Sequence, residues 1–216
     1  MVSLPRSSRT EVAALSPADA RAVLDAVKGD AIEPLVLLSI ATGLRQGEAL
    51  GLRWSDLDLD AGTATVRHAL QRIAGGAPTL VEPKTAKSRR TVSLPSTVTA
   101  LLRAHRTSRL TARLRAGERW IDGDYVFTTA LGAPLDGVNL THRLQRLIAS
   151  AGLPRLRWHD LRHGAASLLL AQGVHPRVVM EMLGHSTIAL TMNTYSHVIP
   201  ALEREAAERM EEALTG

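Results

Sequence analysis

The sequence predicts a single domain of the α+β class, mainly helical, with a small antiparallel β-sheet near the N-terminal third. Three observations lead to this prediction. The 216 residues are enough for one core, or for two small lobes around a cleft. Helix start and stop signals recur along the whole chain, whereas paired strand patterns are confined to its first half. The order of these patterns is not βαβ, and no glycine-rich nucleotide loop occurs.

The first predicted helix begins at a distinct start signal. Residues 1–15 are small, polar and proline-containing, which is typical of a linker or N-terminal extension. Ser16 then stands as an N-cap before a proline, and Asp19 occupies the third helical position. We therefore expect a helix over residues 17–28. Two more helices, separated by a glycine, are expected over residues 32–41 and 45–50.

Four short strands are predicted next. Residues 54–58 and 63–67 flank Asp60-Ala61-Gly62, which is a turn signal. Residues 79–82 and 90–94 enclose a basic loop and suggest a β-hairpin. Together these segments would form the small sheet.

Helices are predicted to dominate the remainder of the chain. The proline and serine at positions 95 and 96 mark the start of a long helix, and later helices end at glycines. The expected helices cover residues 96–116, 137–151, 160–172, 176–183, 188–195 and 201–214. One short buried strand or extended piece is expected at residues 125–128.

Composition excludes several classes of protein. There are no cysteines, so disulfides, thiolate zinc sites and a cysteine nucleophile are ruled out. The chain contains no apolar run of about 18 residues and no apolar signal core at its N-terminus. We therefore expect a cytoplasmic protein that does not enter a membrane.

Basic charge is concentrated in one segment. Residues 84–119 contain ten Lys or Arg and one acid, whereas residues 200–216 contain five Glu and two Arg. Such a basic segment is typical of a polyanion binder. A solvated arginine-rich helix is the alternative, because the whole chain contains 23 Arg and only 3 Lys. The arginines of the long predicted helix cannot all face one groove.

The C-terminal part of the chain contains residue types suited to phosphodiester chemistry. His159 and Arg162 are three residues apart on a predicted helix and share one face. His185 follows a Leu-Gly pair, and Tyr195 is one of only two tyrosines in the chain. In isolation, a capping histidine and a surface arginine would explain the first pair equally well.

Two further candidates lie upstream. Arg45 follows Thr-Gly-Leu at a predicted helix start, where Glu48 could hold it in place; an exposed ion pair is the alternative. Lys84 lies in the loop of the predicted hairpin, with Arg89 and Arg90 as candidate contacts to a nucleic-acid backbone. An ordinary solvated basic turn is the alternative for that loop.

Taken together, these residues resemble the catalytic domain of the tyrosine recombinase, or phage integrase, family. The family signature comprises five sequence blocks, and all five occur here in order, covering roughly residues 10–200. They are Thr42–Glu48, Lys84–Arg90, His159–His163, Leu183–His185 and Thr191–His197. The resemblance implies a catalytic domain at residues 16–199, followed by a helix at 200–216 that docks on a partner protomer or packs on its own domain.

The resemblance also implies a catalytic role for each residue. Tyr195 would attack the scissile phosphorus of double-stranded DNA and form a 3′-phosphotyrosyl link. His159 would accept the phenol proton, and Lys84 would protonate the departing 5′-oxygen. The nonbridging oxygens of the phosphate would be bound by Arg45, Arg162 and His185. Glu48 would hold Arg45 in place.

The same resemblance sets expectations for cofactors and partners. Bond energy is kept in the covalent intermediate, so neither ATP nor a metal is required. His159 and His163 are four residues apart, as in zinc sites, but Asp160 replaces the glutamate of metalloprotease helices and Arg162 would repel a metal. We expect a homo-tetramer on DNA and a monomer without DNA.

Family members usually carry a helical core-binding domain before this one, whereas only residues 1–15 precede the first predicted helix here. The chain by itself is therefore expected to bind DNA weakly and to recombine it poorly. Two alternatives remain. They are DNA relaxation of the topoisomerase IB kind, and a truncated, non-catalytic remnant that binds DNA or regulates an intact integrase.

Overall fold

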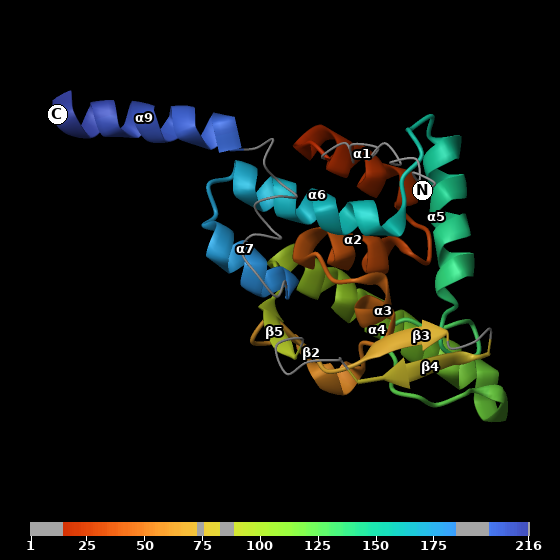
Figure 1. Ribbon diagram of the computed structural model, residues 1–216. Helices are drawn as coiled ribbons and strands as arrows, with labels where there is room; N and C mark the ends of the chain where they lie inside the picture. Colours follow the sequence, from red (N-terminus) through yellow and green to blue (C-terminus); the bar gives the residue numbers. More distant parts are fainter. Residues whose placement is uncertain (1–14, 73–75, 83–88, 185–198, 216) are drawn as a thin grey trace, which may run out of the picture.

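The computed structural model describes residues 15–72, 76–82, 89–184 and 199–215. Helices form most of these residues, and two small antiparallel sheets lie on one side of the helical body (Figure 1). The α+β, mainly helical class predicted from the sequence is confirmed. One continuous hydrophobic cluster fills the body, and a smaller one lies between the last two helices of the body.

Helix α2 (Glu33–Thr42) is the centre of the core. Apolar side chains lie on all sides of this helix, and Leu35, Val36 and Leu38 are completely buried. A helix that is apolar all round must be covered on all sides. It contacts α1 (Pro17–Val27), α4 (Ser96–Ala116) and α6 (Trp158–Ala171), which surround it.

Local signals in the sequence set the ends of the first helices. Ser16 caps α1, because its hydroxyl accepts a hydrogen bond from the Asp19 N–H while the Asp19 carboxylate accepts one from the Ser16 N–H. Gly43 ends α2 in the left-handed region, at φ 65°. A short helix, α3 (Gln46–Leu50), follows, with Arg45 at its N-cap position.

The pairing of the strands differs from the sequence prediction. Strand β5 (Arg90–Ser93) pairs with β2 (Thr63–Val66), which also pairs with β1 (Leu57–Asp58), whereas β4 (Pro78–Val81) pairs with β3 (Ala69–Arg72) in a separate sheet. The expected hairpin between residues 79–82 and 90–94 is therefore wrong. The Gly-Gly pair at positions 75 and 76 is the hairpin signal that the prediction overlooked.

Two other expected strands are shorter or absent. Residues 54–58 begin as a 3₁₀ helix, η1 (Trp54–Asp56), and only the last two of them join the sheet. Residues 125–128 form isolated bridges to Arg53 and Pro134 and no strand. Their apolar side chains are buried nevertheless, because the Val126 N–H donates to the Leu52 carbonyl and holds the segment against the core.

The predicted helices agree with the structure to within about two residues at each end wherever the structure describes them. After α4 come a 3₁₀ turn, η3 (Gly117–Arg119), and then α5 (Gly137–Ser150), α6, α7 (Pro176–Leu183) and α9 (Ile199–Thr215). The helix expected at residues 188–195 lies outside the described residues. Helix α9 extends away from the body (Figure 1). Within the described ranges, no helix is both long and apolar enough to cross a membrane.

Candidate active site

Arg45 lies at the junction of α2 and α3, where Gly43 turns the chain. Its backbone N–H donates to Glu48 Oε2 at 2.9 Å, and its Nη1 donates to Glu48 Oε1 at 2.8 Å. The Arg45 side chain is 43% exposed, whereas that of Glu48 is 7% exposed. A buried carboxylate thus holds a guanidinium that still faces solvent. This is the contact anticipated from the spacing of the two residues.

Arg90, at the start of β5, shares the same carboxylate. Its Nη2 donates to Glu48 Oε2 at 2.9 Å, its Nη1 donates to Oε1 at 3.2 Å, and its Nε donates to the Met182 carbonyl at 2.7 Å. The Arg90 side chain is only 8% exposed. A contact between Arg90 and a DNA backbone does not fit this position, and that interpretation is corrected. Arg89 fits it better, being 59% exposed in an ion pair with Glu82.

Arg162 projects from α6 into the interior between two helix ends. Its Nη1 donates to the Gly43 carbonyl and its Nη2 to the Leu183 carbonyl, each at 2.7 Å. Only 3% of the residue is exposed. A buried cation of this kind is stabilised by carbonyl oxygens at helix ends, which otherwise lack partners.

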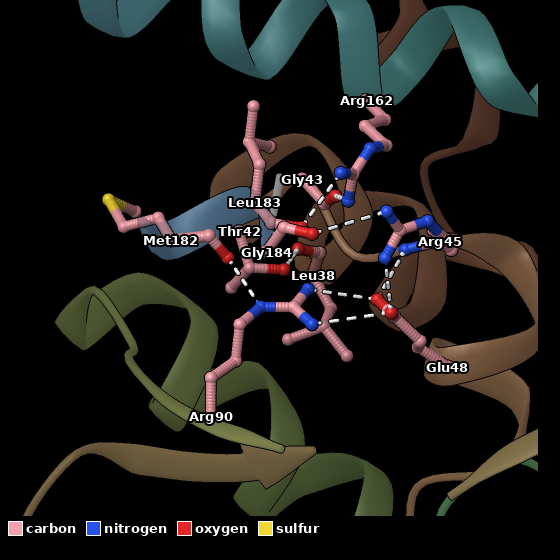
Figure 2. Close-up of polar contacts among 10 residues, drawn as sticks. All are labelled: Leu38, Thr42, Gly43, Arg45, Glu48, Arg90, Arg162, Met182, Leu183 and Gly184. Carbon is pink, nitrogen blue, oxygen red and sulfur yellow. Dashed lines mark hydrogen bonds and ion pairs between the residues drawn. The ribbon is translucent and has the colours of Figure 1, made fainter. Parts of the chain in front are cut away.

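Three arginines from three different elements therefore converge on one turn (Figure 2). The turn is the C-terminal end of α7, where the last carbonyls have no partner within the helix. The donor and acceptor pairs are Arg90 to Met182, Arg162 to Leu183 and Arg45 to Gly184, the last at 3.3 Å. The arrangement gathers positive charge directly before position 185.

His159 lies on α6, one turn before Arg162, and its residue is exposed to solvent. Burial lowers the pKa of His159 below its ordinary value, and the Arg162 cation lowers it further, while Asp160 acts in the opposite direction. The His163 ring stands edge-on to it, with ring centroids 4.5 Å apart, and burial lowers the pKa of His163 as well. A neutral imidazole at neutral pH can accept a proton.

Three of the candidate residues, Lys84, His185 and Tyr195, lie outside the described residues. Of the other candidates, Arg45, Glu48, Arg90 and Arg162 form one polar cluster. Among the residues with a described placement, no group of three or more His, Asp or Glu side chains could hold a metal ion.

The convergence of three arginines on the carbonyls that end α7 was not predicted from the sequence. The sequence did, however, contain one sign that Arg90 points inward. Alternate residues of a strand point to the same face, so Arg90 shares a face with Val92, which is buried. The sequence pattern therefore indicated an inward arginine. Its carbonyl partner could not be anticipated, because Met182 is 92 residues away.

Solved structures of known proteins resemble this fold. The Tn1549 transposon integrase in complex with transposon right end DNA matches 95% of this chain and 68% of that chain, with a TM-score of 0.81 and 25% identity. The catalytic domain of bacteriophage HP1 integrase matches 90% of this chain and 93% of that chain, with a TM-score of 0.57 and 22% identity. The fold is that of tyrosine recombinase catalytic domains.

Sequence comparison identifies the family. The model of the phage integrase family matches residues 14–201. A tyrosine recombinase XerC-like protein of Caldanaerobacter subterraneus subsp. tengcongensis is 35% identical over 217 residues, covering 93% of this chain and 54% of the relative. An integrase of Saccharopolyspora erythraea is 28% identical, covering 95% of this chain and 59% of the relative. The chain belongs to the phage integrase family, and it spans about half the length of these curated relatives.

Proposed function

We propose that the chain cuts and rejoins double-stranded DNA by site-specific recombination, through a covalent link between Tyr195 and a 3′-phosphate. The observation that carries this proposal is the convergence of Arg45 and Arg162 on the turn that ends one residue before His185. The Arg45 side chain is 43% exposed and would contact the phosphate, whereas Arg162 is buried and would add positive charge behind it as the phosphate gains charge during the reaction. Family membership supports the same reaction class.

The reaction begins with attack by the tyrosine. The Tyr195 phenol oxygen bonds to phosphorus, and its proton passes to the neutral imidazole of His159. A phenol has a pKa of about 10, so it needs both this base and nearby positive charge. The lowered pKa of His159 supports its role as the proton acceptor at neutral pH.

The departing group is the 5′-oxygen of the DNA, which takes a proton from Lys84 as its bond to phosphorus breaks. A 5′-hydroxyl of a second strand then attacks the phosphotyrosine and releases the phenol. Each step exchanges one phosphoester bond for another, so we propose that neither ATP nor a metal ion is consumed or required.

Exposed basic residues would hold the duplex. Arg89 is the candidate backbone contact that the structure leaves accessible. Contacts of this kind bind DNA without regard to sequence and weaken as salt rises. Action on DNA would place the protein in the cytoplasm.

We also propose that the working assembly on DNA is a homo-tetramer in which α9 of one protomer docks on a neighbour. Met210 and Leu214 of α9 are 61% and 79% exposed, which leaves an apolar surface without cover in one chain. Removing residues 200–216 should then reduce the mass of the DNA-bound complex, measured by native mass spectrometry, while single-protomer DNA binding persists. An unchanged assembly would show that α9 packs on its own domain.

A suicide substrate tests the proposed chemistry. The full chain is incubated with nicked duplexes drawn from an integrase-type site library. The short fragment that carries the free 5′-hydroxyl diffuses away after cleavage, and its loss traps the covalent intermediate. A protein–DNA adduct should appear on a denaturing gel and disappear in Tyr195→Phe. Relaxation of supercoiled plasmid without strand exchange would favour the topoisomerase alternative. DNA binding without any adduct would leave only the non-catalytic remnant.

A further inference from the structure

Arg90 is the one arginine of the cluster that the proposed reaction does not use. Each of its three guanidinium nitrogens is already engaged, two by the Glu48 oxygens and one by the Met182 carbonyl. At 8% exposure its side chain cannot reach a DNA backbone. An interior arginine that is this well bonded must act through its partners or serve stability alone.

Glu48 needs a second cation if it is to hold Arg45 during the reaction. An anionic phosphate at the site competes with Glu48 for the Arg45 guanidinium, because both present oxygen acceptors. If the Glu48 carboxylate could move together with Arg45, the Arg45 guanidinium would no longer be held in one orientation. The two bonds from Arg90 tie each Glu48 oxygen to the strand on the other side of the cluster.

The glycine at the end of α7 points to the same conclusion. Gly184 adopts φ 66°, and a Cβ there would lie 2.9 Å from Arg90 Nη1 and 3.1 Å from its Cζ. The backbone can therefore approach the guanidinium only because position 184 has no side chain. This close packing fixes Arg90 beside the carbonyl that receives Arg45.

We infer that Arg90 is a positioning residue, which locks Glu48 and the C-terminal turn of α7 so that Arg45 presents its guanidinium to the scissile phosphate in one orientation. The inference rests on the proposed function only where it names the scissile phosphate. The contacts of Arg90 with Glu48 and with the turn of α7 are present without DNA. Lysine cannot substitute, because one ammonium does not reproduce a bidentate carboxylate contact together with a carbonyl contact.

Two variants and a matched control test this role. Arg90→Met removes the charge, and Arg90→Lys keeps the charge but not the planar guanidinium that donates to two partners. The control is Arg177→Met, which breaks an exposed arginine–carboxylate pair on α7, where the two side chains are 64% and 60% exposed. Cleavage of the suicide substrate should slow by about 100-fold in both Arg90 variants, as expected for a slightly misplaced catalytic group, with DNA affinity unchanged. The control should cleave at the wild-type rate.

The pH profile separates positioning from mere stability. The charged groups acting on Glu48 are Arg90 and Arg45; burial opposes them, and together they keep the pKa of Glu48 below its ordinary value. Without Arg90 the pKa of Glu48 rises, so Arg90→Met should lose cleavage at a higher pH than the wild type as the solution is acidified. Arg90→Lys should retain more of the wild-type profile than Arg90→Met.

A crystal structure of Arg90→Met, determined without DNA, supplies a readout that does not depend on activity. The inference expects Glu48 to turn away and Arg45 to leave hydrogen-bonding distance of the Gly184 carbonyl. An Arg45 that keeps both contacts in the variant overturns the inference, as does a cleavage rate within twofold of wild type. If the wild-type chain forms no adduct, the proposed function fails, while the crystal structure still decides the role of Arg90.

Discussion

Arg162 on α6 donates a 2.7 Å hydrogen bond to the carbonyl of Gly43, a residue 119 positions earlier that ends α2. The same guanidinium donates to the Leu183 carbonyl at the end of α7. One side chain thus joins the ends of two helices, and it does so from the interior, where a cation without such partners would be strongly unfavourable. Placement of the candidate phosphate site and stability of the fold therefore depend on the same residue.

Arg162→Lys should destabilise the protein even though it preserves the charge. Lysine cannot donate to both carbonyls in the same planar geometry, so one carbonyl loses its partner and the ammonium is left partly unpaired. We expect a loss of about 3 kcal/mol in the free energy of unfolding, measured by urea denaturation. Arg146→Lys, an exposed position on α5, is the control and should change stability by less than about 0.5 kcal/mol. Equal stability of the two variants would contradict a stabilising role for the hydrogen bonds from Arg162 to the two carbonyls.

Gly43→Ala should cost more than another left-handed glycine replaced in the same way. Gly43 has φ 65°, and a Cβ there would collide with the Leu183 side chain, whereas Gly29 has φ 76° and nothing within 4 Å of such a Cβ. Gly29→Ala therefore measures backbone strain alone, about 1 kcal/mol. We expect Gly43→Ala to lose at least about 2 kcal/mol more, because α7 must shift. Similar unfolding midpoints for the two variants would show that the ends of α2 and α7 are not in close contact.

The sequence was informative where the structure depends on neighbours in the chain. The N-cap at Ser16 and the contact between Arg45 and Glu48 each depend on residues three positions apart, so local spacing was enough to suggest both. The overall fold class and the described helices followed from similar local signals. The catalytic roles of all the candidate residues stay predictions, and three of these residues, Lys84, His185 and Tyr195, also lie outside the described ranges.

Long-range pairing was not predictable in the same way. Strand β5 pairs with β2 although β3 and β4 lie between them in the chain, and no local sequence pattern specifies that partner. The carbonyl partners of Arg162 are likewise set by packing, because backbone oxygens carry no sequence signature. What the sequence did contain was the alternation in β5 that turns Arg90 inward, beside Val92.

Acidification should destabilise the fold through three histidines whose pKa is lowered in the folded state. Burial lowers the pKa of His159, His163 and His105 in the folded state. The unfolded chain then binds more protons below the ordinary histidine pKa of about 6.5, so the free energy of unfolding falls as pH drops through that value. Urea midpoints between pH 7.5 and pH 5.5 should show this fall, and it should be smaller in His159→Gln. A midpoint independent of pH over this range would exclude a lowered pKa for all three.

The basic residues between positions 84 and 119 should contribute unequally to DNA binding. Several arginines of α4 are already engaged: Arg103 pairs with Asp60 at 2.6 Å, and Arg113 pairs with Asp122 at 2.6 Å. Among the described residues Arg89 likewise pairs with an exposed carboxylate, that of Glu82, but it directly precedes Arg90 of the cluster in the chain and so lies nearer in sequence to the proposed phosphate site. Each phosphate contact contributes about 0.9 to the slope of log affinity against log salt.

Arg89→Gln should therefore lower that slope by about 0.9, whereas the double variant Arg103→Gln, Arg113→Gln should leave it unchanged. Fluorescence anisotropy with a labelled duplex, measured over a range of salt concentrations, gives both slopes. The argument depends on the slope rather than on affinity at one salt concentration, because loss of an intramolecular ion pair changes stability but releases no counterions from DNA. A reduced slope in the double variant would place α4, rather than the residues beside Lys84, against the duplex.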